Sequence, residues 1–241
     1  MRGEFELIAR HFAPLTDGTP GAFGLSDDAC ILTPPTDRDL VYTCDTIGAG
    51  VHFLPDDPPE DVARKLLRVN LSDLAAMGAR PEGYLLNAAF MREIEEEWIA
   101  RFAAGLVDDQ RRFGITLWGG DTTGAPGPTT LSVTAVGSVP HGRALRRAGG
   151  RVGDGVYVSG TIGDSALGLK VALGELAPEA ANDRDLLIGR YRRPCPRVAL
   201  GQALVGRDLA TACLDVSDGL IADLAHLCAV SGVGAEIAAP A

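Results

Sequence analysis

Aspartates recur at the ends of apolar segments along this chain of 241 residues. Asp45 ends the apolar run at 40–44, Asp121 follows a second short run, and Asp215 and Asp218 flank the start of a third apolar stretch. A single aspartate in such a place is most often a turn or helix-cap residue. Repetition at several predicted strand ends instead favours an open α/β arrangement, because such sheets gather ligand-binding groups where their strands end.

Hydrophobic periodicity predicts the secondary structure of the first 140 residues. The apolar segments short enough to be strands are 40–44, 115–118 and 129–139. Two longer amphipathic segments, 59–77 and 93–113, predict helices that each end directly before a glycine. The segment 118–128, which is rich in glycine and proline, is expected to be a loop.

The length of the chain allows two domains of ordinary size. Residues 140–155 are rich in glycine and arginine and lack apolar periodicity, which predicts a boundary there. We expect an N-terminal domain at 1–140, a linker at 141–155 and a second domain at 156–241. The second domain is expected to begin with a strand at 156–160 and to contain a strand, loop and helix around 213–224.

Charge and cysteine content narrow the class of protein. A formal net charge of −10 argues against a nucleic-acid binder, because phosphate backbones are neutralised by clusters of Lys and Arg. A phosphorylated ligand would therefore have to bind together with cations. The five cysteines include no C-x-x-C pair, and no apolar stretch reaches the roughly 18 residues of a membrane span, so a cytoplasmic protein without membrane association is predicted.

The predicted helix at 59–77 carries polar residues on its apolar side. At 100° per residue, Asn70 and Asp73 fall on the arc that Leu66 and Val69 define. The residues on the opposite, polar arc are Arg64, Lys65, Arg68 and Ser72. A buried carboxylate is tolerated when it is paired, hydrogen-bonded or bound to a metal, so Asp73 is expected to have a cationic partner.

The chemistry of these residues favours magnesium. Ligand sets made only of oxygen suit hard ions such as Mg²⁺ rather than zinc. Because Mg²⁺ usually binds one or two carboxylates together with substrate phosphates, six or seven acids indicate several ions and a nucleotide, with phosphoryl transfer as the leading reaction. The chain lacks the P-loop, the H-R-D catalytic loop and a strand-anchored G-x-G-x-x-G, which excludes P-loop and protein-kinase folds.

Two further features allow more than one interpretation. Arg143, Arg146 and Arg147 form a compact basic cluster, which is either a phosphate clamp or a solvated linker. The glycine-rich turn at 159–169 could present backbone N–H groups to an anion, although an ordinary helix cap is the more common use of such a sequence.

Several segments of the chain together form a distinctive set. They are GEFELIAR (3–10), GLSDDAC (24–30), TCDTIGAGVHF (43–53), VNLSDLAAMGARP (69–81), WGGDTT (118–123), GRALRRAGGRVGD (142–154), VSGTIGDSALGL (158–169), RRPCPR (192–197) and LDVSDGLIADL (214–224). These segments resemble the thiamine-monophosphate kinase family, whose superfamily also includes aminoimidazole ribonucleotide synthetase and selenophosphate synthetase. They follow one another across almost the whole chain, so the signal is more specific than any single motif.

The resemblance implies an α+β or α/β fold of two domains, like that of aminoimidazole ribonucleotide synthetase. It implies an N-terminal mixed sheet with helices and a C-terminal α/β domain. That second domain is expected to be truncated, because members continue to an acidic Gly-Gly-Glu-Asp-Tyr segment. The implied activity is the ATP-dependent phosphorylation of thiamine monophosphate to thiamine diphosphate by direct in-line transfer with several Mg²⁺ ions, in a homodimer joined through the N-terminal domains.

Site residues follow from the resemblance by position. The implied magnesium ligands are Asp28, Thr43, Asp45, Asp73, Asp121, Asp215 and Asp218. The implied nucleotide contacts are Gly120, Asp121, Arg147 and Ser217. His52 is expected to face thiamine monophosphate. No general base is assigned, because a phosphate monoester with a second pKa near 6 is already largely ionised at neutral pH.

The chain departs from the family pattern at Ser26, where glycine is usual, and at Cys44, where a hydroxyl residue is usual and a thiol would be a poor magnesium ligand. Selenophosphate synthetase is disfavoured because residues 1–26 contain neither a cysteine nor a lysine. The alternatives that stay open are another ATP-dependent synthetase or kinase of the superfamily and a protein that binds magnesium and nucleotide without catalysis.

Overall fold

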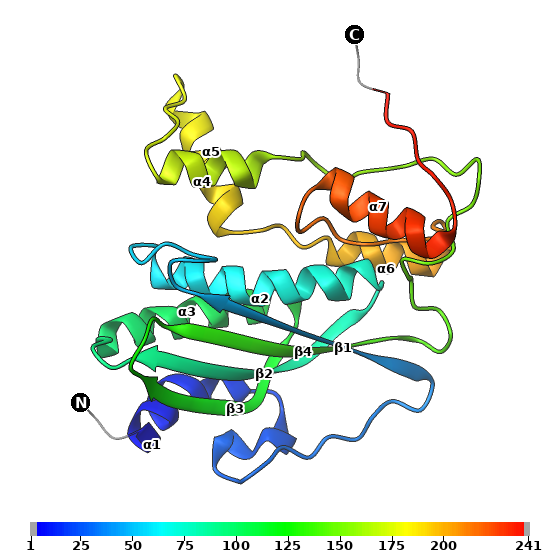
Figure 1. Cartoon of the computed structure of the whole chain (residues 1–241). Helices are drawn as coiled ribbons and strands as arrows, with labels where there is room; N and C mark the ends of the chain where they lie inside the picture. The colour runs from blue at the N-terminus through cyan, green and yellow to red at the C-terminus, as the bar shows by residue number, and fades with distance from the viewer. Residues whose placement is uncertain (1–3, 239–241) are drawn as a thin grey trace.

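The structure is a computed structural model that describes residues 4–238 (Figure 1). Residues 1–3 and 239–241, at the two ends of the predicted domains, lie outside the described part. The N-terminal segment contains short helical turns at Glu4–Leu7 (α1), Ile8–Phe12 (η1), Ala13–Thr16 (η2) and Pro20–Leu25 (η3). The strands that follow are Arg38–Gly48 (β1), Arg80–Met91 (β2), Thr116–Ala125 (β3) and Thr130–Pro140 (β4).

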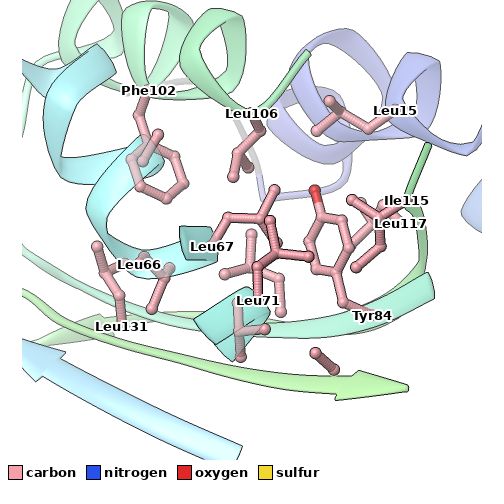
Figure 2. Packing of buried hydrophobic residues seen from close by; sticks show 14 of the residues in the cluster. Leu15, Leu66, Leu67, Leu71, Tyr84, Phe102, Leu106, Ile115, Leu117 and Leu131 are labelled. Atoms are coloured by element: carbon pink, nitrogen blue, oxygen red, sulfur yellow. The ribbon is translucent and has the colours of Figure 1, made fainter. Parts of the chain in front are cut away.

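The four strands form one mixed sheet in the order β1-β4-β2-β3. Strand β4 pairs antiparallel with β1 and with β2, whereas β2 and β3 run parallel. Two long helices, Pro59–Ala76 (α2) and Glu96–Phe113 (α3), cover one face of this sheet, and the core between them is filled by leucines together with Tyr84 and Phe102 (Figure 2). The predicted mixed sheet with helices is therefore confirmed.

Local signals account for the ends of both long helices. Helix α2 begins with Pro59 and has Glu60 and Asp61 in its first turn, where a fixed φ and negative charge are both favourable. Helix α3 ends at Gly114, which adopts the left-handed conformation with φ of 65°. The predicted helices at 59–77 and 93–113 thus match α2 and α3 closely.

The C-terminal part of the described chain is helical. Its helices are Asp164–Ala172 (α4), Ala181–Arg192 (α5), Val198–Arg207 (α6) and Leu220–Ser231 (α7). In Figure 1 they lie beyond α2, on the side away from the sheet. Helix α6 crosses α2 very closely, because a Cβ added at Gly201 would come within 2.0 Å of the Ala75 carbonyl oxygen.

Helix α2 is therefore enclosed on both sides, and part of its polar arc is buried. Lys65 and Arg68 are buried. The Arg68 guanidinium pairs with the Asp109 carboxylate of α3 at 2.6 Å, and it also donates to the Pro194 carbonyl at 3.3 Å. The basic residues of α2 thus join the sheet-bearing part of the molecule to the C-terminal helices.

Strand β2 was not predicted, and the segment 118–128 was wrongly expected to be a loop. Glycine, proline and alanine give β2 a weak strand signal, yet Tyr84, Leu86, Ala88 and Phe90 alternate on its buried side. Pairing with β2 keeps residues 118–125 extended as the second part of β3. Gly120 is required there, because its φ is 151° and a Cβ would lie 1.8 Å from the Leu86 carbonyl oxygen.

The strands predicted at 156–160 and near 213–216 are absent from the part of the chain between residues 4 and 238. A strand needs a hydrogen-bonded neighbour, and the pairs that the sheet contains involve β1 to β4 only. Tyr157, in the first of these segments, is 93% exposed. The domain boundaries at 140 and 155 stay a prediction.

Candidate active site

The candidate site begins where β1 passes beneath α2. Thr43 and Asp45 pair in register with Ala135 and Val133, both buried, so their side chains point to the covered face of the sheet. The Thr43 hydroxyl donates a hydrogen bond of 2.5 Å to the carboxylate of Asp73 on α2. The side chains of Thr43 and Asp45 on β1 thus face the Asp73 carboxylate on α2.

Asn70 fixes the strand at this point. Its side chain is fully buried on α2, where the amide nitrogen donates to the Leu66 carbonyl at 2.9 Å. The amide oxygen accepts the backbone N–H of Asp45 at 3.1 Å. Because both halves of the amide are satisfied, the polar residue on the apolar arc positions Asp45 relative to Asp73.

A third carboxylate, Asp215, reaches the site from the segment that precedes α7. Burial raises the pKa of Asp73, and the neighbouring Asp45 adds to this, whereas the Thr43 hydrogen bond and the charge of Arg147 oppose it. Burial and the Asp73 carboxylate raise the pKa of Asp215. Burial and the Asp215 carboxylate likewise raise the pKa of Asp45, with His52 acting in the opposite direction.

The expected cationic partner of Asp73 is not a protein side chain in direct contact. Among residues 4–238, the ion pairs that form do not include Asp73, and Arg147 acts on it only through its charge. Three carboxylates that raise one another's pKa in a half-buried site form an arrangement that a cation would stabilise.

An open cavity of about 310 Å³ lies beside these residues, and its walls include Thr43, Asp73, Met77, Arg147 and Asp215. No three or more His, Cys, Asp or Glu side chains of the described residues gather closely enough to bind one ion by themselves. Mg²⁺ commonly takes one or two carboxylates and completes its octahedron with water and substrate phosphate. The all-oxygen donor set fits Mg²⁺ in that mode.

The arginine cluster divides between two roles. Arg143 donates to the Val205 carbonyl at 3.1 Å and so ties the segment after β4 to α6. Arg147 lines the cavity, and its carbonyl accepts the Ser231 hydroxyl of α7 at 3.0 Å. Arg143 therefore fits neither a phosphate clamp nor a freely solvated linker, since it makes a structural contact, whereas the place of Arg147 on the cavity wall is compatible with a phosphate clamp.

Sequence reasoning missed Asp223, which shapes the loop before α7. This aspartate is 6% exposed, and one of its carboxylate oxygens accepts the backbone N–H groups of Ser217, Asp218 and Gly219 at 3.0, 3.1 and 3.1 Å. The side chains of Ser217 and Asp218 are thereby left on the exposed side of the loop. An aspartate in the first turn of a helix that follows glycine was the available signal.

His52 lies in the turn after β1. The backbone N–H of Gly48 donates to its Nδ1 at 3.1 Å, so in the neutral ring Nε2 carries the proton and can donate to a ligand. Its charge acts on Asp45, which places it next to the carboxylate cluster. His52, the expected contact to the acceptor substrate, therefore lies near Asp45, one of the expected metal ligands.

Asp28 and Asp121 are not brought into this cluster. Asp121 pairs in register with Asn87, whose neighbours Leu86 and Ala88 are buried, so Asp121 points to the outer face of the sheet. Asp28 lies in the exposed loop after η3, and η3 packs against β3 at the sheet edge opposite β1. The Cys44 thiol also lies on the outer face, where Thr134 contacts it at 3.5 Å.

Among the helices of residues 4–238, none is both long and apolar enough to span a bilayer.

Two family models match most of the chain. The one described as AIR synthase related protein, N-terminal domain, matches residues 26–139, and the one described as AIR synthase related protein, C-terminal domain, matches residues 151–241. The thiamine-monophosphate kinase of Escherichia coli (strain K12) is 46% identical over 236 residues, which cover 98% of this chain and 71% of the relative.

Solved structures of thiamine-monophosphate kinases also resemble this chain in sequence and fold. The crystal structure of thiamine-monophosphate kinase from Stenotrophomonas maltophilia K279a matches with a TM-score of 0.83 and 43% identity, over 95% of this chain and 72% of that one. AaThiL complexed with AMPPCP and TMP matches with a TM-score of 0.76 and 33% identity, over 96% of this chain and 72% of that one. Sequence and fold together show that the chain belongs to the thiamine-monophosphate kinase family, which is a family of kinases.

Proposed function

We propose that this protein phosphorylates thiamine monophosphate to thiamine diphosphate with ATP as the donor. The observation that carries the proposal is the cluster of Asp45, Asp73 and Asp215, whose pKa values are raised by burial and by one another beside a cavity lined by Arg147. The likeness to AaThiL, a relative complexed with AMPPCP and TMP, supports the choice of substrates.

The reaction brings two polyanions together. Two like unit charges about 4 Å apart at an effective dielectric near 20 repel by roughly 4 kcal/mol, so several such repulsions must be offset. Mg²⁺ ions held by the three carboxylates would supply the positive charge and stabilise an in-line transfer. Arg147 contributes a cation to the same wall, and Thr43 keeps Asp73 oriented through its hydrogen bond.

The remaining predicted ligands are assigned by their position. Ser217 and Asp218 stand exposed on the loop that Asp223 organises, where Ser217 can donate its hydroxyl to a nucleotide phosphate and Asp218 can bind metal. His52 offers Nε2–H to the acceptor phosphate. No side chain is assigned as a general base, because the acceptor oxygen is already ionised at neutral pH.

Gly120, Asp121 and Asp28 belong to the same function through a homodimer. Within residues 4–238, side chains on the outer face of the sheet stay exposed, and some of them are apolar, with Tyr42 65% exposed and Leu85 37% exposed. We propose that two copies associate through these faces. This association brings the nucleotide contacts at Gly120 and Asp121 and the metal ligand Asp28 to an interface rather than to open solvent. A cytoplasmic location stays a prediction.

One assay tests the proposal. The purified protein is incubated with ATP and MgCl₂, with and without thiamine monophosphate, and ADP and thiamine diphosphate are quantified by chromatography. The proposal predicts that both products form in equal amounts and only when the acceptor is present. Binding of ATP without turnover that depends on the acceptor would favour a non-catalytic nucleotide-binding protein instead.

A further inference from the structure

Lys65 lies where α2, the turn that carries His52 and α5 meet. Its ammonium group donates to the main-chain carbonyl of His52 at 2.8 Å and lies 3.6 Å from the centre of the Tyr191 ring. The side chain is 7% exposed. A buried cation is costly unless its contacts compensate. A carbonyl and an aromatic face offset part of that cost, and burial still lowers the pKa of Lys65 to about 8.

A second contact fastens the same loop to the same helix. Asp57 is 3% exposed, and its carboxylate accepts the backbone N–H of Leu54 at 2.9 Å and the Arg192 guanidinium at 2.7 Å. Tyr191 and Arg192 are consecutive residues in the last turn of α5. The loop at 48–57 is therefore held at two points by neighbouring side chains of one C-terminal helix.

The position of the imidazole depends on these contacts. The ring of His52 is held from one side by the Gly48 N–H, and its backbone is held by the bond from His52 N–H to the Gly48 carbonyl at 2.9 Å. Lys65 adds the only bond to the His52 carbonyl that the described residues supply. Loss of the ammonium would release the residue that faces the acceptor while leaving the carboxylates of the site untouched.

We propose that Lys65, Tyr191, Asp57 and Arg192 are positioning residues through which α5 sets the place of His52 for the acceptor substrate. The inference rests on the proposed function, since it assumes that His52 contacts thiamine monophosphate. It assigns to Tyr191 and Arg192, in the last turn of α5, a part in acceptor binding in addition to the packing of that helix against α2. The nucleotide side of the site, at Asp73 and Arg147, makes no contact with this cluster among the described residues.

The test separates the acceptor from the nucleotide. Lys65→Met keeps the apolar stem and removes the ammonium, and Lys65→Arg restores a cation. We expect Lys65→Met to raise KM for thiamine monophosphate about tenfold, with KM for ATP within about twofold of the unsubstituted protein and partial recovery in Lys65→Arg. Arg192→Gln, a change at a partly exposed side chain, is expected to act in the same direction and serves if Lys65→Met does not fold.

Arg193→Gln is the matched control. Arg193 also joins α5 to α2, through Asp61 at 3.5 Å, but it does not touch the loop at 48–57. Both KM values should stay unchanged in this variant. The inference is overturned if the folded Lys65 and Arg192 variants keep KM for thiamine monophosphate, or if Arg193→Gln raises it equally. A lack of thiamine diphosphate formation by the unsubstituted protein would instead contradict the proposed function.

Discussion

The Thr43 hydroxyl and the Asp73 carboxylate form a hydrogen bond of 2.5 Å that joins β1 to α2 at the candidate site. The bond opposes the rise that burial imposes on the pKa of Asp73 and helps to keep the carboxylate ionised. An ionised carboxylate is the form that binds Mg²⁺. Strand β1 therefore carries one expected metal ligand, Asp45, and through Thr43 it also orients another, Asp73 of α2.

Asp73→Asn should fold and lose most activity, because it removes a charged oxygen donor while keeping the shape of the side chain. We expect kcat/KM to fall by about 100-fold or more, with partial recovery at high magnesium concentration. Steady-state kinetics over a magnesium titration measure this. Asp39→Asn, on the exposed start of β1 beside His141, is the control and should keep full activity. Unsubstituted turnover by Asp73→Asn at limiting magnesium would refute the assignment.

Asp223→Ala should disorder the loop that carries Ser217 and Asp218. The substitution leaves three backbone N–H groups without their shared acceptor and is expected to lower the free energy of unfolding by about 1 to 2 kcal/mol. KM for ATP should rise more than KM for thiamine monophosphate. Asp223→Asn, which keeps one carbonyl acceptor, should show a smaller effect of both kinds. Equal behaviour of the two variants would argue against the hydrogen-bonding role.

The pH dependence of stability follows from the raised pKa of Asp215. Between its unfolded and folded values the folded state binds more protons, so stability falls as pH rises through this window. Without divalent ions, Asp215→Asn should therefore be more stable than the unsubstituted protein at pH about 7.5, by about 0.5 to 1 kcal/mol. The difference should shrink as pH falls and vanish below about pH 3, where the carboxyl group is protonated in both states. Urea unfolding at several pH values measures it, and a difference that does not change with pH would contradict this explanation.

The crossing of α6 over α2 provides a test of how the C-terminal helices dock. Gly201→Ala places a Cβ about 2.0 Å from the Ala75 carbonyl oxygen, so the helices must separate, and the free energy of unfolding should fall by about 2 kcal/mol. Gly206→Ala in the same helix meets open space and should instead stabilise by about 0.5 to 1 kcal/mol. Thermal unfolding of both variants compares them directly, and an equal effect would show that the crossing is loose.

Part of this fold could be predicted because its signals are local. Pro59 and Gly114 mark helix ends by their own backbone preferences, so α2 and α3 were placed within a few residues. Strand β2 has no such signal, since Gly83 and Pro81 weaken it and its identity comes from pairing with β3 and β4. The extended form of 118–125 depends on that same pairing, so both errors have one cause.

The residues of the candidate site also differ in whether local sequence could predict their place. The pattern along α2 was sufficient to single out Asp73, because a carboxylate on an apolar arc needs an explanation. The direction of Asp121 could not be inferred, since a register irregularity between Tyr84 and Leu85 decides which residues of β3 face outward. The place of Asp223 in the first turn of α7 after a glycine was an available signal, but its backbone partners could not be inferred, because they meet it only when the loop closes in three dimensions.

The most direct measurement is the formation of thiamine diphosphate and ADP as free Mg²⁺ is raised from zero. Asp45, Asp73 and Asp215 are proposed to hold cations that let the two phosphorylated substrates approach one another. This role predicts no product in EDTA, equal amounts of the two products once Mg²⁺ is present, and a higher Mg²⁺ requirement when any one of these aspartates is changed to asparagine. Product formation in EDTA, or a Mg²⁺ requirement in all three variants that is unchanged from that of the unsubstituted protein, would contradict it.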